Sequence, residues 1–303
     1  MTTHDNYRAQ VELLIRCLPA VAEVPDFALK GGTAINLFLL NMPRLSVDID
    51  LTYLPISSRE EALRGIHTRL TNIAETIEGD IPNVDVRILK KDIMPKLYVR
   101  KQGVTVKVEP NAIVRGSLLP PVTSELCPAA QEAYDTFTEI QQLDTSEVYA
   151  GKICAALDRQ HPRDLFDIML LQAAGPIPDM TRQAFVAYLA GNRRPIANTL
   201  QPKRQPIEEA FTSQLIGMTE MPVDLASLED ARTQLFEWVA NALSENERRF
   251  LLSIKQGEPD WSLLPFKGLD RWPAIQWKLL NIRKMDNHRH KTALNRLREV
   301  LQI

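Results

Sequence analysis

The sequence predicts an α+β protein in which a domain with a small mixed sheet is followed by an all-helical domain. Two observations support this fold class. Before residue 110, short segments with the apolar pattern of strands are interspersed with helical segments. After residue 146, apolar residues recur at helical spacing and prolines punctuate the chain. We therefore expect one domain over residues 1–145 and a second over residues 146–303.

The elements of the first domain follow from apolar spacing and turn residues. A helix is predicted over residues 7–21, and a capping box at Ser58 and Glu61 predicts a second helix that ends near residue 78. Gln102 and Gly103 are predicted to form a hairpin turn. Residues 125–144 show no regular pattern. The expected strands cover residues 27–29, 44–53, 84–89, 97–100 and 104–109.

The second domain is predicted to consist of helices joined by loops. The first two helices should cover residues 147–159 and 163–172, with Pro162 at the position where proline commonly begins a helix. The later helices are expected at residues 181–190, 207–216, 227–243, 245–255 and 273–303.

Composition and charge exclude several classes of protein. The formal net charge is −2, so the whole molecule is not a basic nucleic-acid binder, and any such role requires a local patch. No apolar run approaches the roughly 20 residues that span a bilayer, and the polar N-terminus lacks a signal-peptide pattern. Cys17, Cys127 and Cys154 have no metal-ligand spacing. We expect a reduced, cytoplasmic protein with no membrane contact.

One stretch of the first domain carries the clearest indication of chemistry. Gly31 and Gly32 are expected to form a tight turn before a helix of about two turns, which Thr33 is predicted to cap. Unpaired backbone N–H groups at such a turn suit a phosphate group. The next strand carries Asp48 and Asp50 at alternate positions, so both carboxylates should point to one face.

The two carboxylates predict a metal site beside the phosphate cradle. Carboxylates are the ligands that Mg²⁺ prefers, and this combination suits phosphoryl or nucleotidyl transfer. Ser46 should share their face, and Glu109, at the end of a later strand, is a candidate third carboxylate. Each feature alone has a simpler interpretation, because paired glycines are common in turns and strand-end acids such as Glu109 are often only solvated. The combination is more specific than its parts.

Two sequence blocks resemble a known family. The segments Lys30-Gly-Gly-Thr-Ala-Ile-Asn-Leu37 and Arg44-Leu-Ser-Val-Asp-Ile-Asp-Leu51 are similar to motif I of the DNA polymerase β-like nucleotidyltransferase superfamily. They look in particular like its AbiEii/AbiGii-type toxin branch, which includes type IV toxins and the MenT toxins. The segment from Glu147 to Asp167 resembles the second block of that branch. The order and separation of the two blocks fit the family.

The resemblance implies roles for the residues of the first block. Asp48 and Asp50 would bind Mg²⁺ ions that hold the triphosphate of an NTP. Glu109 would bind the metal or activate the attacking hydroxyl. The residues expected to contact the nucleotide are Gly31, Gly32, Thr33, Arg44 and Ser46. Arg44 has an alternative role as an ion-pair residue that holds the fold.

The second block is implied to complete the active site from the helical domain. Lys152 and Arg159 lie about two helical turns apart and would stabilise charge on the leaving pyrophosphate; a solvated helix face is the alternative. Asp164 would lie nearest the chemistry and orient Lys152 or the acceptor. Asp167 is expected to be structural, because it is placed to pair with Arg163 on its own helix.

Residues 271–303 contain a concentration of basic side chains with Trp272 and Trp277 among them. If the acceptor is tRNA, as the resemblance to MenT toxins implies, this tail could contact the phosphate backbone together with residues 193–194 and 203–204. A solvated terminal helix or an antitoxin-binding surface are the alternatives. The candidate RNA-binding residues are Arg283, Lys284, Arg289 and Lys291, and the same tail holds Arg271, Lys278, Arg296 and Arg298.

The resemblance therefore implies a Mg²⁺-dependent nucleotidyltransferase that acts as the toxin of a toxin–antitoxin or phage-defence system. It would transfer NMP from an NTP to an RNA acceptor at the 3′ end of tRNA, block translation, and have a cognate antitoxin protein as a partner. Two alternatives stay open. One is an enzyme of the same fold that modifies a small molecule or a protein, and the other is a protein that binds an NTP without transferring it.

Overall fold

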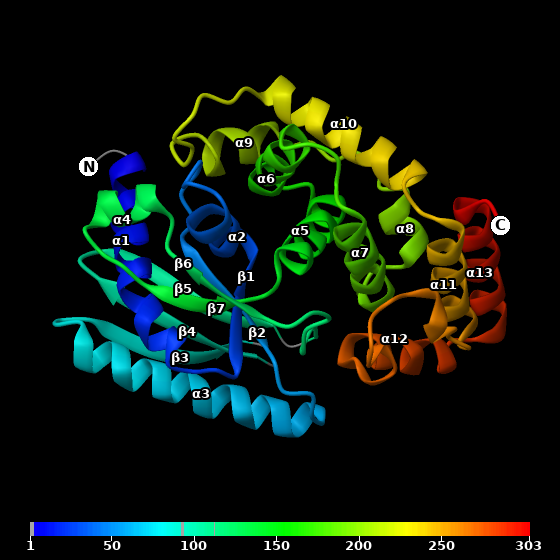
Figure 1. Cartoon of the computed structure of the whole chain (residues 1–303), viewed down its shortest axis with the longest axis horizontal. Helices are drawn as coiled ribbons and strands as arrows, with labels where there is room; N and C mark the ends of the chain where they lie inside the picture. Colours follow the sequence, from blue (N-terminus) through cyan, green and yellow to red (C-terminus); the bar gives the residue numbers. More distant parts are fainter. Residues whose placement is uncertain (1–2, 92–93, 112) are drawn as a thin grey trace. The chain divides into compact units, whose positions relative to one another are not determined.

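The computed structural model describes residues 3–91, 94–111 and 113–303 and divides the chain into two compact units (Figure 1). Unit 1 comprises Met1–Asp144 together with Gln214–Pro222. Unit 2 comprises Thr145–Ser213 and Val223–Ile303. The sequence led us to expect a single boundary at residue 145. The structure has that boundary, and in addition residues 214–222 return to unit 1.

Unit 1 is built on a mixed seven-stranded sheet within the described residues, with the strand order β3-β4-β5-β2-β1-β7-β6. Neighbouring strands are antiparallel except for the pairs β2–β5 and β1–β7, which are parallel. The α+β fold and the mixed sheet confirm the sequence prediction. The strands are β1 (Phe27–Lys30), β2 (Asp48–Tyr53), β3 (Asp85–Lys91), β4 (Met94–Lys101), β5 (Val104–Asn111), β6 (Val122–Glu125) and β7 (Glu139–Gln142).

Two long helices, α1 (Thr3–Ala22) and α3 (Arg59–Asp80), pack against one face of this sheet. The strand residues beneath them are fully buried, among them Leu97, Val99, Val106 and Val108. Residues at alternate positions of the same strands are only partly buried, so this sheet has one apolar face and one polar face. The predicted capping box begins α3, with reciprocal side-chain and backbone hydrogen bonds between Ser58 and Glu61.

The region around residues 125–144 contains short elements that the sequence pattern did not predict. The strands β6 and β7 have four residues each, and α4 (Pro128–Tyr134) has seven. Segments of this length are too short to show a clear apolar period, and β6 lies at an edge of the sheet with its residues largely exposed. The short helix α2 (Gly31–Ala34) and the π-helical turn η1 (Ile35–Leu39) follow β1.

The returning segment 214–222 is held in unit 1 by backbone hydrogen bonds beside the start of β2. The Leu45 N–H donates to the Met218 carbonyl at 2.7 Å, and the Glu220 N–H donates to the Pro43 carbonyl at 3.0 Å. The Met218 side chain is 1% exposed, so it belongs to the core of unit 1. This segment thereby supports the chain immediately before the carboxylate strand.

Unit 2 is helical in its described residues, as predicted. The expected single helix over residues 273–303 is in fact two helices, because Asp286 begins a new helix by accepting hydrogen bonds from the N–H groups of His288 and Arg289. The helices are α5 (Thr145–Arg159), α6 (Pro162–Ala173), α7 (Asp179–Gly191), α8 (Ile196–Leu200), α9 (Glu208–Gln214), α10 (Leu225–Asn241), α11 (Glu245–Gln256), α12 (Pro273–Arg283) and α13 (Asn287–Leu301). Among the residues described, none of the helices has the length and apolar character needed to cross a membrane.

Candidate active site

Asp48 and Asp50 lie on the polar face of β2. Ile49 and Leu51 alternate with them and are fully buried on the opposite face. The Asp48 side chain is 34% exposed, so a ligand can reach it. The alternation of side chains along the strand therefore places both carboxylates together at the surface of the sheet.

Position 31 requires glycine, because the backbone there lies close to the Asp50 side chain. Its backbone φ is +71°, which side-chain-bearing residues rarely adopt. A Cβ atom at this position would lie 2.5 Å from Asp50 Oδ2. The turn and the carboxylate strand are also paired directly, since Lys30 and Asp50 are register partners in the β1–β2 ladder. The glycine therefore lets the turn backbone lie against the Asp50 carboxylate.

Gly32 makes room for Arg44 and Ser46. A Cβ atom on Gly32 would lie 2.8 Å from Arg44 Nη2 and 3.0 Å from Ser46 Oγ. Arg44 is 2% exposed, and its Nη1 donates to the Leu45 carbonyl at 2.9 Å. This burial favours the second of the two roles expected for Arg44, that of a residue that holds the fold. Ser46 precedes β2 and is buried, with its hydroxyl beside the Gly31–Gly32 turn.

Thr33 differs from its expected role as a helix cap. The helix begins at Gly31 after the extended residue Lys30, which places Thr33 inside the helix. Its hydroxyl donates to the Asp48 carbonyl at 2.6 Å and lies 2.9 Å from the Ser46 hydroxyl. Because the Thr33 side chain is fully buried, its hydroxyl fixes the turn to the start of β2 and is not placed to bind a phosphate.

Glu109 lies next to Asp50 across the parallel β2–β5 pair, where the two are register partners. Its Oε2 accepts a hydrogen bond from Lys96 Nζ at 2.7 Å, and this bond raises the pKa of Lys96. Lys107 Nζ lies 3.9 Å from Asp48 Oδ1. Sequence reasoning missed Lys96, although the register of the predicted 102–103 hairpin places residue 96 opposite residue 109.

The donor set of this site fits Mg²⁺ bound jointly by protein and substrate. Across residues 3–91, 94–111 and 113–303, no cluster of three His, Cys, Asp or Glu side chains could hold a metal ion by itself. Mg²⁺ is usually bound by one or two carboxylates, with phosphates and waters as its other ligands. Asp48 and Asp50 meet this requirement, and the backbone of Gly31 lies beside Asp50.

In unit 2, Lys152 on α5 is enclosed by two aspartates of α6. Lys152 Nζ lies 2.9 Å from Asp164 Oδ1 and 2.9 Å from Asp167 Oδ2, and all three side chains are at least 95% buried. Asp167 is therefore tied to a residue of the neighbouring helix, and a solvated face for Lys152 is excluded. Sequence spacing within α6 could not show that Asp167 points to a neighbouring helix.

Arg159 completes this buried charge cluster from the solvent side. Its Nε and Nη2 donate to the two carboxylate oxygens of Asp164 at 2.5 Å and 2.9 Å, while its side chain remains 64% exposed. Burial alone would raise the pKa of Asp164, but Lys152 and Arg159 outweigh it and hold that pKa well below its usual range. Of the two predicted cations, Arg159 is the one accessible to a ligand.

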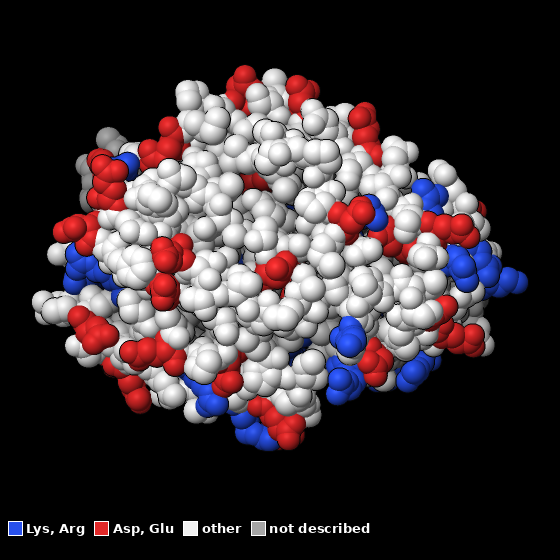
Figure 2. Space-filling model, viewed as in Figure 1, with Lys and Arg blue, Asp and Glu red and all other residues white. Residues whose placement is uncertain are grey.

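The basic tail is exposed at its four candidate RNA-binding residues but not throughout. Lys278 is buried and donates to the carbonyls of Asn192 and Arg194 at 2.7 Å each, so its expected place in a basic surface is wrong. Burial, together with nearby Lys255, lowers the pKa of Lys278 to about 8. Figure 2 shows acidic and basic side chains interspersed on the viewed face. The exposed candidates are Arg283, Lys284, Arg289 and Lys291.

Comparisons with known proteins identify the family of the chain. The sequence matches the family model "Nucleotidyl transferase AbiEii toxin, Type IV TA system" over residues 12–281. The fold is similar to that of MenT4, a nucleotidyltransferase toxin from Mycobacterium tuberculosis, with a TM-score of 0.64 and 18% identity over 91% of this chain and 93% of that chain. Terminal uridylyl transferase 4 from Trypanosoma brucei, solved with dUTP, aligns over 97% of this chain and 93% of that chain with 12% identity and a TM-score of only 0.29. No curated protein matches the sequence significantly. Because the family model covers most of its length, the chain belongs to the AbiEii family of nucleotidyltransferase toxins.

Proposed function

We propose that this toxin transfers NMP from an NTP to an RNA hydroxyl in a Mg²⁺-dependent reaction. The observation that carries the proposal is the approach of the Gly31 backbone to Asp50, which shares the polar face of β2 with Asp48. A close backbone beside two accessible carboxylates suits a metal-bound triphosphate. Bound Mg²⁺ would neutralise charge on the phosphates as pyrophosphate leaves.

The chain's own residues have distinct roles in this proposal. Asp48 and Asp50 hold the metal, and the turn at Gly31 and Gly32 approaches the phosphates through backbone N–H groups. Glu109, the register partner of Asp50, is the candidate third carboxylate, and Lys96 positions it. The acceptor hydroxyl attacks the α-phosphate, the bond to pyrophosphate breaks, and the hydroxyl proton passes to a base.

The cluster in unit 2 supplies cationic groups. Arg159 is exposed and oriented by Asp164, so it is suited to a phosphate oxygen. Lys152 is held by Asp164 and Asp167, and we assign it to the nucleotide site through this cluster. We further propose that the 3′ end of tRNA is the acceptor, that the exposed basic residues of α12 and α13 contact RNA, and that a cognate antitoxin binds the protein in the cytoplasm.

The acceptor is tested by incubating the protein with Mg²⁺, each α-labelled NTP in turn, and total tRNA. We expect label on tRNA, and we expect Asp50→Ala to abolish it. Omission of the divalent cation should abolish it as well. Label on a small hydroxyl compound or on protein but not on RNA would instead favour a different acceptor, and NTP binding without any transfer would favour a binding protein.

The biological role requires a separate test. Expression of the wild-type chain in a bacterial host should arrest growth, whereas Asp48→Ala should not, at equal protein levels. If a host carrying the toxin also resists phage infection, the phage-defence role is supported. Growth arrest by Asp48→Ala as strong as that by the wild type would contradict toxicity through nucleotidyl transfer.

A further inference from the structure

The polar face of the sheet extends from the carboxylates across β5, β4 and β3. Asp48 pairs with Lys107 in the β2–β5 register, Lys107 pairs with Tyr98 in the β4–β5 register, and Tyr98 pairs with Arg87 in the β3–β4 register. Adjacent strands lie about 4.8 Å apart, so Tyr98 is about 10 Å from Asp48 along this row. We refer to Asp85, Arg87, Lys96, Tyr98, Arg100, Lys107 and Glu109 as the β3–β5 polar face.

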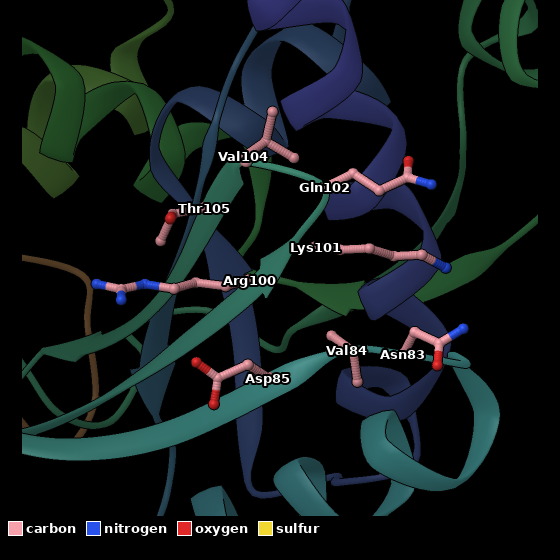
Figure 3. Close-up of a pocket in the computed structure, with 9 residues that line it drawn as sticks. Asn83, Val84, Asp85, Arg100, Lys101, Gln102, Val104 and Thr105 are labelled. Atoms are coloured by element: carbon pink, nitrogen blue, oxygen red, sulfur yellow. The ribbon is translucent and has the colours of Figure 1, made fainter.

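This face is accessible and lies opposite the helices that cover the sheet. The side chains of Arg87 and Lys107 are 62% and 43% exposed. The helices α1 and α3 contact the other face, where Val99 and Val106 are fully buried. Figure 3 shows Arg100 directed to one side of the sheet edge, with Lys101, the next residue, directed to the other side.

The β3–β5 polar face has the chemistry of a nucleic-acid surface. It carries four cations, Arg87, Lys96, Arg100 and Lys107, around the aromatic ring of Tyr98. Its acidic members are Glu109, which is paired with Lys96, and Asp85, which is the register partner of Arg100 and accepts a hydrogen bond from Arg87 Nε at 2.9 Å. Aromatic rings on exposed sheet faces stack on unpaired bases, while flanking Lys and Arg contact the phosphate backbone.

We propose that the β3–β5 polar face binds the single-stranded end of the RNA acceptor, with Tyr98 stacked on a base and Arg100 on a phosphate. This inference rests on the proposed function, in which the acceptor is RNA. The row from Tyr98 through Lys107 to Asp48 leads directly to the carboxylates, so a strand bound here would deliver its terminal hydroxyl to the metal site. The β3–β5 polar face belongs to unit 1, whereas the basic tail of α12 and α13 belongs to unit 2.

The test measures binding of a fluorescein-labelled RNA hairpin with a short single-stranded 3′ end to the full-length protein, compared with a blunt hairpin of the same stem. Tyr98→Ala should weaken binding of the overhang hairpin by about tenfold, because stacking on one aromatic ring is lost. Tyr98→Phe keeps the ring and should bind like the wild type. Arg100→Gln should reduce the slope of the logarithm of the binding constant against the logarithm of the salt concentration by about one. Lys101→Gln, on the other side of the same strand, is the matched control. It should change neither the affinity for the overhang hairpin nor the dependence of that affinity on salt.

Nucleotide transfer to tRNA, measured on the same preparations, separates this inference from the proposed function. If the wild type labels tRNA and Tyr98→Ala binds and labels it equally well, the inference is overturned and the proposed function stands. Equal binding and labelling of tRNA by Tyr98→Ala and the wild type is also the result expected if an acidic protein, and not RNA, binds this face. If the wild type binds neither hairpin and labels no RNA, both fail. Weaker binding in Lys101→Gln than in Arg100→Gln would also overturn the inference.

Discussion

Gly31 and Asp50 approach each other so closely that the position of one depends on the other. The turn backbone at Gly31 has a positive φ, and the space that a Cβ atom would need is taken by the Asp50 carboxylate. The hydroxyl of Thr33 ties the same turn to the carbonyl of Asp48. The Gly-Gly pair and the two aspartates, which are separate in sequence, are therefore one packed unit.

Replacing Gly31 by alanine should lower both stability and metal affinity. The positive φ costs roughly 1 kcal/mol for alanine, and the clash with Asp50 adds to that cost. Urea unfolding and Mn²⁺ titration measure the two effects. Gly79→Ala is the control, because a Cβ atom at this position of α3 meets no other atom within 4 Å. Equal stability and Mn²⁺ affinity in Gly31→Ala and the wild type would contradict the packing argument.

Lys152 is a buried cation whose position depends on two carboxylates. Removing one partner from a buried ion pair leaves a charge without compensation, which costs far more than loss of an exposed pair. Asp164 also accepts from both Arg159 nitrogens and so connects the buried lysine to the exposed guanidinium. This makes Asp164 the residue on which the cluster depends most.

Asp164→Asn should lower the free energy of unfolding by about 3–5 kcal/mol at neutral pH. The pKa of Asp164 is lowered in the folded state, so its contribution is complete above the unfolded-state pKa of about 4 and is lost as the pH falls toward the folded-state pKa. The difference in the free energy of unfolding between the wild type and Asp164→Asn should therefore become smaller as the pH is lowered. Urea unfolding across a pH series measures it.

Asp179→Asn is the matched control for this prediction. Asp179 pairs with Arg182, but its side chain is 80% exposed. Its replacement should change the free energy of unfolding by less than about 1 kcal/mol. A loss as large as that in Asp164→Asn, or a difference for Asp164→Asn that grows on acidification, would show that burial of the charge cluster is not the cause.

Among the elements, the returning segment 214–222 is the one that most affects the carboxylate strand. It lies far along the chain, yet its backbone pairs with residues 43–45, immediately before Ser46 and Asp48. Met218 anchors the segment in the core of unit 1. The start of β2 is thus supported by chain that follows the helices α5 to α9.

Met218→Ala should destabilise the protein by about 2–5 kcal/mol, because a buried methionine is lost and a cavity remains. Met221 lies in the same segment but is 42% exposed, so Met221→Ala should change stability by less than about 0.5 kcal/mol. Thermal unfolding of both variants measures the difference. Similar midpoints for the two would show that the segment is not anchored in the core.

Elements with strong local signals could be predicted from the sequence, and others could not. The capping box of α3 and the Gln102–Gly103 turn are formed by neighbouring residues, so their chemistry is visible in the sequence. The strands β6 and β7 are too short for a period to show. The break between α12 and α13 depends on Asp286, which caps the start of α13. Apolar residues recur at helical spacing on both sides of Asp286, so the sequence pattern did not reveal the break.

At the scale of the whole molecule, the sequence predicted the residue types of the site better than their contacts. The shared face of Asp48 and Asp50 follows from strand alternation and was predictable. The pairing of Lys152 with Asp167 depends on how two helices pack, which no local pattern encodes. The return of residues 214–222 to unit 1 is likewise a long-range feature.

The family assignment and the carboxylate geometry together make nucleotidyl transfer the central claim. Its most direct test is single-turnover reaction of the protein with Mg²⁺, RNA and an NTP labelled at either the α- or the γ-phosphate. We predict that α-label appears on RNA while γ-label leaves as pyrophosphate. Asp50→Asn should slow the transfer by at least about a hundredfold, because loss of a metal ligand removes several kcal/mol of charge stabilisation. Asp80→Asn, an exposed acid at the end of α3, should not slow it. Transfer of γ-label to RNA, or an unchanged rate in Asp50→Asn, would contradict the claim.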